Sequence, residues 1–470
     1  MSERRKATPI LAACLAGLVL AGAAGGPRAN EAAAESDATT DMVRLSLPQA
    51  QALAQQALRT GQPRTAYELT EGLITANPEN GHAHFLRAHA LGQMKDYKTG
   101  RQSAARAYRV ANTDVQRFEA AKLAAELSFA DDSYSVSQLW LRRAVHYAPN
   151  EELRSQYVKA FRNVRRTNPL RFELQFSINP SDNVNNGSNS PYNLIEGSPL
   201  VGTLSPSAQA ISGVVARTDM RGSYRVQQSK RHETHITGRL HSREVRFNDP
   251  VPGISGSDIS SLRLQLGVSH LWAPSKSGYW SFDINGGRTW YGRSPYYDFA
   301  GIGVRRMQKL SDTLNLSLGV HVEEQFDKVA PITDATVYSA FAGLSYALST
   351  GGELGAQLQF RDVDSDGRNR ASQQWSVVAT YTLGREIGPA QVSFSVGHST
   401  LDYEQYWVLL PVAGGRTDES WFGGVTAAFN DYSYMGFVPV VSVNAEKSRS
   451  NISRFDVDQT AVSFGIRSEF

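Results

Sequence analysis

Apolar and polar residues alternate in short segments from Leu170 to the end of the chain at Phe470. In the stretch 354–361 every even position is apolar, and the odd positions are Gly, Gln or Arg. The stretches 262–269 and 314–323 also have apolar residues at every even position and Gly or a polar residue at every odd position. Because successive side chains of a strand point to opposite faces, this period of two predicts strands with one apolar and one polar face.

The pattern predicts about fourteen strands, many of them longer than the roughly five or six residues usual in soluble sheets. A tilted strand needs about 9–11 residues to cross a bilayer, and most of these segments reach that length. An even number of strands also returns both ends of the sheet to one side. The expected ranges are 170–178, 211–228, 231–247, 258–272, 278–291, 295–309, 313–327, 334–348, 352–361, 371–384, 389–402, 416–430, 435–447 and 456–470.

The linkers between these strands alternate in length. Linkers after even strands are tight, as at 229–230 and 349–351, whereas most linkers after odd strands are longer and more polar, notably 179–210 and 403–415. Short turns at one end and long loops at the other are typical of transmembrane β-barrels. Aromatic residues near strand ends are expected to form interfacial girdles: Trp272, Trp280, Trp290, Tyr291, Tyr296, Tyr297, Tyr381 and Trp421.

The preceding segment, 47–166, is predicted to be a helical solenoid. Gly61, Ala66 and Pro78 occupy the turn, second-helix and end positions of a helix-turn-helix repeat of tetratricopeptide type, and a second unit starts near Gly81. A third unit is looser, and 151–166 is expected to be a capping helix. Such stacks present a concave groove for a peptide or protein. The groove positions expected from the register are Gln51, Gln55, Arg59, Phe85, His89 and Gln93.

The N-terminus carries an export pattern. Arg4, Arg5 and Lys6 precede a short apolar run and then small residues, which predicts a secretory signal peptide within 1–34, followed by a leader at 35–46. Cleavage after residue 23, 29 or 34 fits equally. The stretch 11–14, which ends in Cys14, also resembles a lipoprotein signal motif; the alternative is a cysteine inside the discarded segment. On that alternative the mature chain contains no cysteine and no disulfide.

Composition narrows the function classes. The formal net charge is only +3, but 42–167 is basic and the remainder slightly acidic. No mature stretch approaches about 18 consecutive apolar residues, so a membrane-bound form has to be a closed barrel. No nucleophile motif, phosphate-binding loop or metal-ligand cluster indicates an enzyme or a cofactor. The stretch 362–367 copies the start of a calcium loop, but Gln373 stands where Glu is expected, which favours an acidic external hairpin.

Two stretches resemble a known family. The junction at Asn168-Pro169 leads into a first strand and then into Asn179-Pro180-Ser181-Asp182-Asn183-Val184-Asn185-Asn186. The stretch 448–456 leads into the last strand. Together with the repeats and the roughly fourteen strands, these features resemble the surface lipoprotein assembly modifier family. The last strand also resembles the signal recognised by the barrel assembly machinery, at Val462, Phe464, Ile466 and Phe470.

The resemblance implies an α + β multidomain protein: a periplasmic tetratricopeptide-like solenoid at 47–166 followed by an antiparallel transmembrane β-barrel of about fourteen strands at 167–470. It implies an outer-membrane translocator that delivers client proteins, typically surface lipoproteins, to the cell exterior. Expected partners are the client, periplasmic chaperones, the assembly machinery and outer-membrane lipids, without nucleic acid. A porin or polysaccharide-export channel is the alternative. Asn183, Asn185 and Asn186 match the family stretch, and their sequence indicates only a turn-rich loop.

Overall fold

A computed structural model describes residues 45–199, 201–432, 434 and 436–468. The predicted signal peptide and nearly all of the predicted leader lie outside the described residues. The chain divides into two compact units whose boundary falls between Thr167 and Asn168. In the described part of the chain, no helix has both the length and the apolar character needed to cross a membrane.

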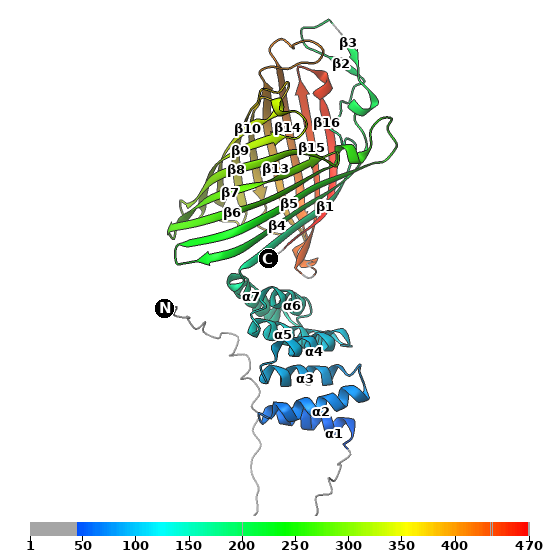
Figure 1. Ribbon diagram of the computed structural model, residues 1–470, viewed down its shortest axis with the longest axis vertical. Coiled ribbons are helices and arrows are strands. Elements are labelled where there is room, and N and C mark those ends of the chain that lie inside the picture. Colours follow the sequence, from blue (N-terminus) through cyan, green and yellow to red (C-terminus); the bar gives the residue numbers. More distant parts are fainter. Residues whose placement is uncertain (1–44, 200, 433, 435, 469–470) are drawn as a thin grey trace, which may run out of the picture. The chain divides into compact units, whose positions relative to one another are not determined.

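The first unit contains seven described helices, stacked in antiparallel pairs (Figure 1). A residue with left-handed backbone turns the chain inside each of the three pairs: Gly61, Lys95 and Asp132. Side chains also fix the helix starts, because Asn80 accepts a hydrogen bond from the Ala83 amide and satisfies an otherwise free donor. The helices are α1 (Leu47–Arg59), α2 (Pro63–Ala76), α3 (Gly81–Gln93), α4 (Tyr97–Arg109), α5 (Asp114–Ala130), α6 (Tyr134–His146) and α7 (Glu151–Thr167).

Small residues set the spacing of these helices. Ala66 and Ala90 are fully buried, and together with Ala57 they form one core cluster. A Cβ atom at Gly100 would lie 3.2 Å from the Ala88 carbonyl oxygen, so α3 and α4 approach as closely as backbones allow. Phe161 of α7 is also buried and closes the last pair. The tetratricopeptide-like solenoid predicted from the repeat spacing is therefore confirmed.

The second unit is a closed antiparallel barrel of fourteen strands (Figure 1). Each strand pairs with its neighbours along the chain, and β1 closes the cylinder against β16. The predicted barrel is confirmed. The strands are β1 (Leu170–Ser181), β4 (Gly213–Gln228), β5 (His232–Phe247), β6 (Ser261–Ser275), β7 (Gly278–Tyr291), β8 (Ser294–Lys309), β9 (Leu314–Asp327), β10 (Ala335–Ala347), β11 (Glu353–Asp364), β12 (Ser372–Thr382), β13 (Gln391–Tyr403), β14 (Arg416–Ala428), β15 (Phe437–Ser450) and β16 (Val457–Ser468).

Alternation gives the barrel two unlike faces. The even-numbered positions of β6 from 262 to 268 are apolar and point outward, with Leu266 73% exposed. The cross-strand partner of Leu266 is Gly286 of β7. Ile284, two residues before Gly286, is 67% exposed on the same outer face. In water such a continuous apolar surface would be unfavourable, whereas in a bilayer acyl chains cover it. The inner positions, such as Gln265 and Asn285, are polar and border the lumen.

The structure corrects several predicted strand ends: β1 runs to Ser181 and β15 to Ser450, beyond the predicted ends at 178 and 447. The stretch 362–364, predicted to belong to an external loop, continues β11, because Val363 is buried against Ala335 and Val337 of β10. The long linker after β1 also contains a two-stranded hairpin that the alternation did not reveal: β2 (Tyr192–Leu194) and β3 (Val201–Thr203). It projects at the long-loop end of the barrel (Figure 1). Both strands are too short to display a period of two.

Candidate functional site

The predicted groove residues lie on α1 and α3, the first helices of their pairs. Gln55 and Arg59 are exposed and Gln51 is half-buried on α1. Gln93 near the end of α3 is exposed, and its Nε2 donates a hydrogen bond to the Leu58 carbonyl oxygen at 3.3 Å. Gln93 therefore connects α3 to α1, which is a structural contact that the sequence did not indicate.

Phe85 and His89 form an aromatic pair on α3. Their ring centroids lie 4.7 Å apart in an edge-to-face arrangement, and both side chains are half-buried. Burial lowers the pKa of His89 to about 4, and the positive charge of Lys122 on α5 acts in the same direction. The imidazole is therefore neutral near pH 7, so the pair offers a largely uncharged surface with one polar ring.

α5 carries three charged residues that sequence reasoning missed, and the charge of one of them, Lys122, acts on His89. Lys122 Nζ lies 3.2 Å from Glu119 Oε2. Burial raises the pKa of Glu126, and Glu119 adds to the rise while Lys122 opposes it. Counting from the helix starts, Lys122 and Glu126 correspond to His89 and Gln93 of the preceding pair. The 34-residue period alone misses them, because α5 starts 33 residues after α3 and the period therefore points one residue too far along α5.

The Asn-rich stretch after β1 acts as a clasp for the long linker between β1 and β4. The Asn183 side chain is fully buried, and it both donates to the Gly187 carbonyl and accepts from the Gly187 amide, each at 2.8 Å. Asn185 Nδ2 donates to the carbonyls of Ser207 and Gln209, and Asn185 Oδ1 accepts from the Ile211 amide. A primary amide has two donors and an acceptor with two lone pairs, so it can bridge two backbone strands where a carboxylate cannot.

Asn186 supplies the turn within this clasp. Its φ of +50° is in the left-handed region, which Asn tolerates better than most residues. The clasp is also joined to the last strand, because Gln459 Nε2 of β16 donates to the Asn183 carbonyl at 2.6 Å. Beyond it, the hairpin β2–β3 is held by the loop before β16, since the Leu194 amide donates to Ser453 Oγ at 2.7 Å. Ser188 Oγ also donates to the Ser453 carbonyl at 3.0 Å, so the family-like stretches at 179–188 and 448–456 are in contact with each other.

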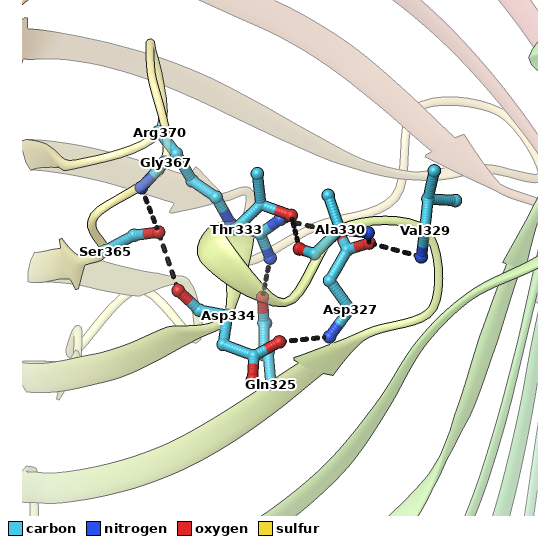
Figure 2. A network of polar contacts seen from close by, with 9 residues as sticks. All are labelled: Gln325, Asp327, Val329, Ala330, Thr333, Asp334, Ser365, Gly367 and Arg370. Carbon is cyan, nitrogen blue, oxygen red and sulfur yellow. Dashed lines mark hydrogen bonds and ion pairs between the residues drawn. The ribbon is translucent and has the colours of Figure 1, made fainter.

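A second network joins the loop after β9 to the loop after β11, and Figure 2 shows its residues. Arg370 Nη1 lies 3.1 Å from Asp327 Oδ2, and Arg370 Nη2 donates to Gln325 Oε1 at 3.1 Å. Ser365 Oγ donates to the Asp334 carbonyl at 2.6 Å. The Asp327 side chain is only 5% exposed, so this ion pair is largely removed from water. The two loops are therefore fixed to each other by protein groups.

Inside the barrel, long side chains lie along the wall. Arg263 of β6 reaches across two strands to Glu323 Oε2 of β9 at 2.6 Å, and its guanidinium lies 3.5 Å from the centroid of the Phe299 ring. Glycine leaves room for the Phe299 ring: at Gly287, a Cβ atom would lie 2.8 Å from Phe299 Cζ. Replacing small residues by larger ones on this wall would push the long side chains toward the lumen axis.

The predicted assembly signal lies on β16. Val462, Phe464 and Ile466 alternate on the outer face, with Phe464 54% exposed, and Ile466 is the cross-strand partner of Phe176 on β1. Phe470 lies outside the described residues. Of the predicted aromatic girdle, Trp421 points outward and is 57% exposed. Tyr297 instead faces the lumen and accepts a hydrogen bond from Arg263 at 3.1 Å, so its place in an outer girdle is wrong.

The fold defines an outer-membrane β-barrel preceded by a helical-repeat unit. Among the described residues, no group of three or more His, Cys, Asp or Glu side chains could hold a metal ion. Comparison with known families gives the more specific assignment. The family model of the surface lipoprotein assembly modifier matches residues 171–464, and the chain belongs to that family. No curated protein matches the chain.

Solved structures match each unit separately. The outer-membrane protein OmpT of Vibrio cholerae is 10% identical, with 64% of this chain and 97% of that chain covered and a TM-score of 0.33. The anion-selective porin of Comamonas acidovorans is 12% identical over 64% of this chain and 98% of its own, with a TM-score of 0.32. The type III secretion translocator chaperone SycD of Yersinia enterocolitica is 15% identical over 28% and 96%, with a TM-score of 0.24.

Proposed function

We propose that this protein delivers client proteins, in particular surface lipoproteins, across the outer membrane, and that the helical unit captures the client or its chaperone on the periplasmic side. The family assignment carries this proposal, because it connects the whole barrel segment with surface lipoprotein assembly. In this proposal the barrel provides the route or a part of it.

The side chains of the predicted groove in the helical unit support the capture step. α1, α3 and α5 present amide, aromatic and charged side chains, which suit an extended chain that needs both hydrogen bonds and apolar contacts. Phe85 and the neutral His89 would contact apolar client residues, and Lys122 together with Glu119 would fix orientation. Gln51, Gln55 and Arg59 extend the same face along α1.

Deletion of residues 47–166 tests the proposal in cells. We expect the barrel to assemble in the outer membrane, and display of clients on the surface to be lost. Client display is measured by protease accessibility on intact cells, and barrel assembly by heat-modifiable migration of the protein. Unchanged display in the deletion strain would contradict the role of the helical unit.

Two point variants make the test sharper. Phe85→Ala removes the aromatic group of the predicted groove, and we expect client display to fall severalfold. Leu139→Ala is the matched control, because Leu139 is 52% exposed on α6, a second helix of its pair. A passive channel predicts the same small effect for both variants.

A further inference from the structure

One wall of the lumen carries more arginine side chains than carboxylates. A cavity of about 800 Å³ extends along the inner wall from β5 to β12, within the range of roughly 300–1,000 Å³ for ligand sites. Arg239, Arg305 and Arg361 line it, from β5, β8 and β11, and Asp283 is the one carboxylate among its lining residues in the described chain.

These guanidinium groups are poorly neutralised. Arg239 and Arg221 share the single carboxylate of Asp219, and both arginines remain about half exposed, at 43% and 53% of their side chains. Within the described residues, no carboxylate lies within ion-pair distance of Arg305 or Arg361. A solvated wall with unbalanced guanidinium groups attracts anions, and its field is strengthened by the low-dielectric surroundings of a membrane pore.

The remaining lining side chains are amides and hydroxyls. Gln265, Gln357 and Gln359 each present donors and an acceptor, which match the N–H and C=O groups of an extended backbone. Asn285 Oδ1 is buried and has no hydrogen-bond partner in the described structure, so one acceptor is left for a donor in the cavity.

We infer that this wall binds an extended, acidic segment of polypeptide. The inference rests on the proposed export function, which supplies a polypeptide to the lumen. A polypeptide is favoured over an anionic saccharide because the glutamine side chains of the wall match the alternating N–H and C=O groups of a peptide backbone.

The alternation of β8 supplies a matched control. Arg305 points into the lumen, whereas the next residue, Arg306, points outward and lies over the Trp280 ring at 5.2 Å. Arg305→Gln and Arg306→Gln thus remove the same charge at neighbouring positions on opposite faces. The double variant Arg305→Gln/Arg361→Gln removes two unpaired charges. The double variant Arg305→Lys/Arg361→Lys keeps both positive charges but lacks the planar guanidinium group.

Peptide binding is measured on the full chain folded in detergent. Ser376 also lines the cavity, so Ser376→Cys in a Cys14→Ser background gives a single labelling position for an environment-sensitive dye. The dye is titrated with octaglutamate, octalysine and oligogalacturonate, and heat-modifiable migration verifies that each variant folds. Because the dye reports from the lumen, binding of octaglutamate to the basic helical unit does not interfere.

We expect octaglutamate to change the dye signal at lower concentration than octalysine. We expect the double Gln variant to weaken octaglutamate binding about tenfold, as the loss of two solvated ion pairs implies. Arg306→Gln should bind like the unaltered chain, and the double Lys variant should recover most of the affinity. Equal responses to the two peptides, or an unaltered affinity in the double Gln variant, would overturn the inference.

If oligogalacturonate gave a stronger response than octaglutamate, the ligand of this wall would be an anionic saccharide, and the inference of a polypeptide ligand would be wrong. The titration involves no client and no living cell. Failure of this inference is therefore separate from failure of the export proposal, which the display experiment tests independently.

Discussion

At the scale of single residues, the amide side chains after β1 show how one short stretch shapes the long-loop end of the barrel. Asn183 and Asn185 hold opposite sides of the linker between β1 and β4 by backbone hydrogen bonds. Their family resemblance thus has a structural explanation.

Asn183→Ala should loosen this clasp. The substitution removes both hydrogen bonds to Gly187 and leaves those backbone groups buried, at a cost of about 1–3 kcal/mol. Local opening of the linker should then increase about tenfold, measured as the rate of proteolysis within 189–205 on the folded protein. Asn186→Gly is the control, since Gly readily adopts the left-handed backbone at this position and should preserve resistance.

His89 should make the helical unit sensitive to acid. Its folded pKa of about 4 lies below the ordinary 6.5, so the unfolded chain binds more protons between these values. The contribution of neutral His89 is complete above pH 6.5 and is lost as the pH falls toward 4. The effect is on the order of 2–3 kcal/mol. Amide protection of α3 in the full chain should fall over this window, and less so in His89→Gln.

At the scale of elements, alternation was a strong guide wherever one face met lipid. It predicted all fourteen barrel strands, and 278–291 matches β7 to the residue. It failed where other contacts decide the structure. β11 is longer than predicted because Val363 packs against β10, and the hairpin β2–β3 depends on hydrogen bonds from the distant loop before β16. Neither contact leaves a local pattern.

The candidate sites were less predictable than the strands. The repeat spacing indicated the helices that bear Gln55 and His89, but not Lys122 and Glu126, because the third unit departs from the period. The basic wall of the lumen requires knowledge of which strands adjoin and which face turns inward. Arg239, Arg305 and Arg361 are far apart in sequence, so only the closed barrel brings them to one cavity.

The network shown in Figure 2 gives a prediction at this scale. Arg370→Ala would leave Asp327 nearly buried without its cation, and breaking a buried pair in this way costs about 3–5 kcal/mol. We expect faster hydrogen exchange in both joined loops, 328–334 and 365–371. Arg368→Ala is the matched control, because the exposed Arg368 lies 4.7 Å from the Trp407 ring and is not part of the network. Equal exchange in the two variants would show that the ion pair does not hold the loops.

At the scale of the whole molecule, two units with different surfaces serve one proposed task. The outer face of the barrel needs a bilayer, while the helical unit buries its core without one. A passive channel needs only the barrel. The helical unit and the family assignment together favour a protein that acts on other proteins, and the basic lumen wall extends that proposal to the character of the passing chain.

The proposed delivery of client proteins to the cell surface is tested most directly by quantitative proteomics. The proteins that a protease releases from intact cells are compared between cells with and without this protein. We expect a defined set of lipoproteins to disappear from the protease-accessible fraction while their total amounts in the cell stay the same. Restoring the full chain should return them to the surface. If the accessible fraction is identical in the two strains, the protein does not deliver clients and the central claim is wrong.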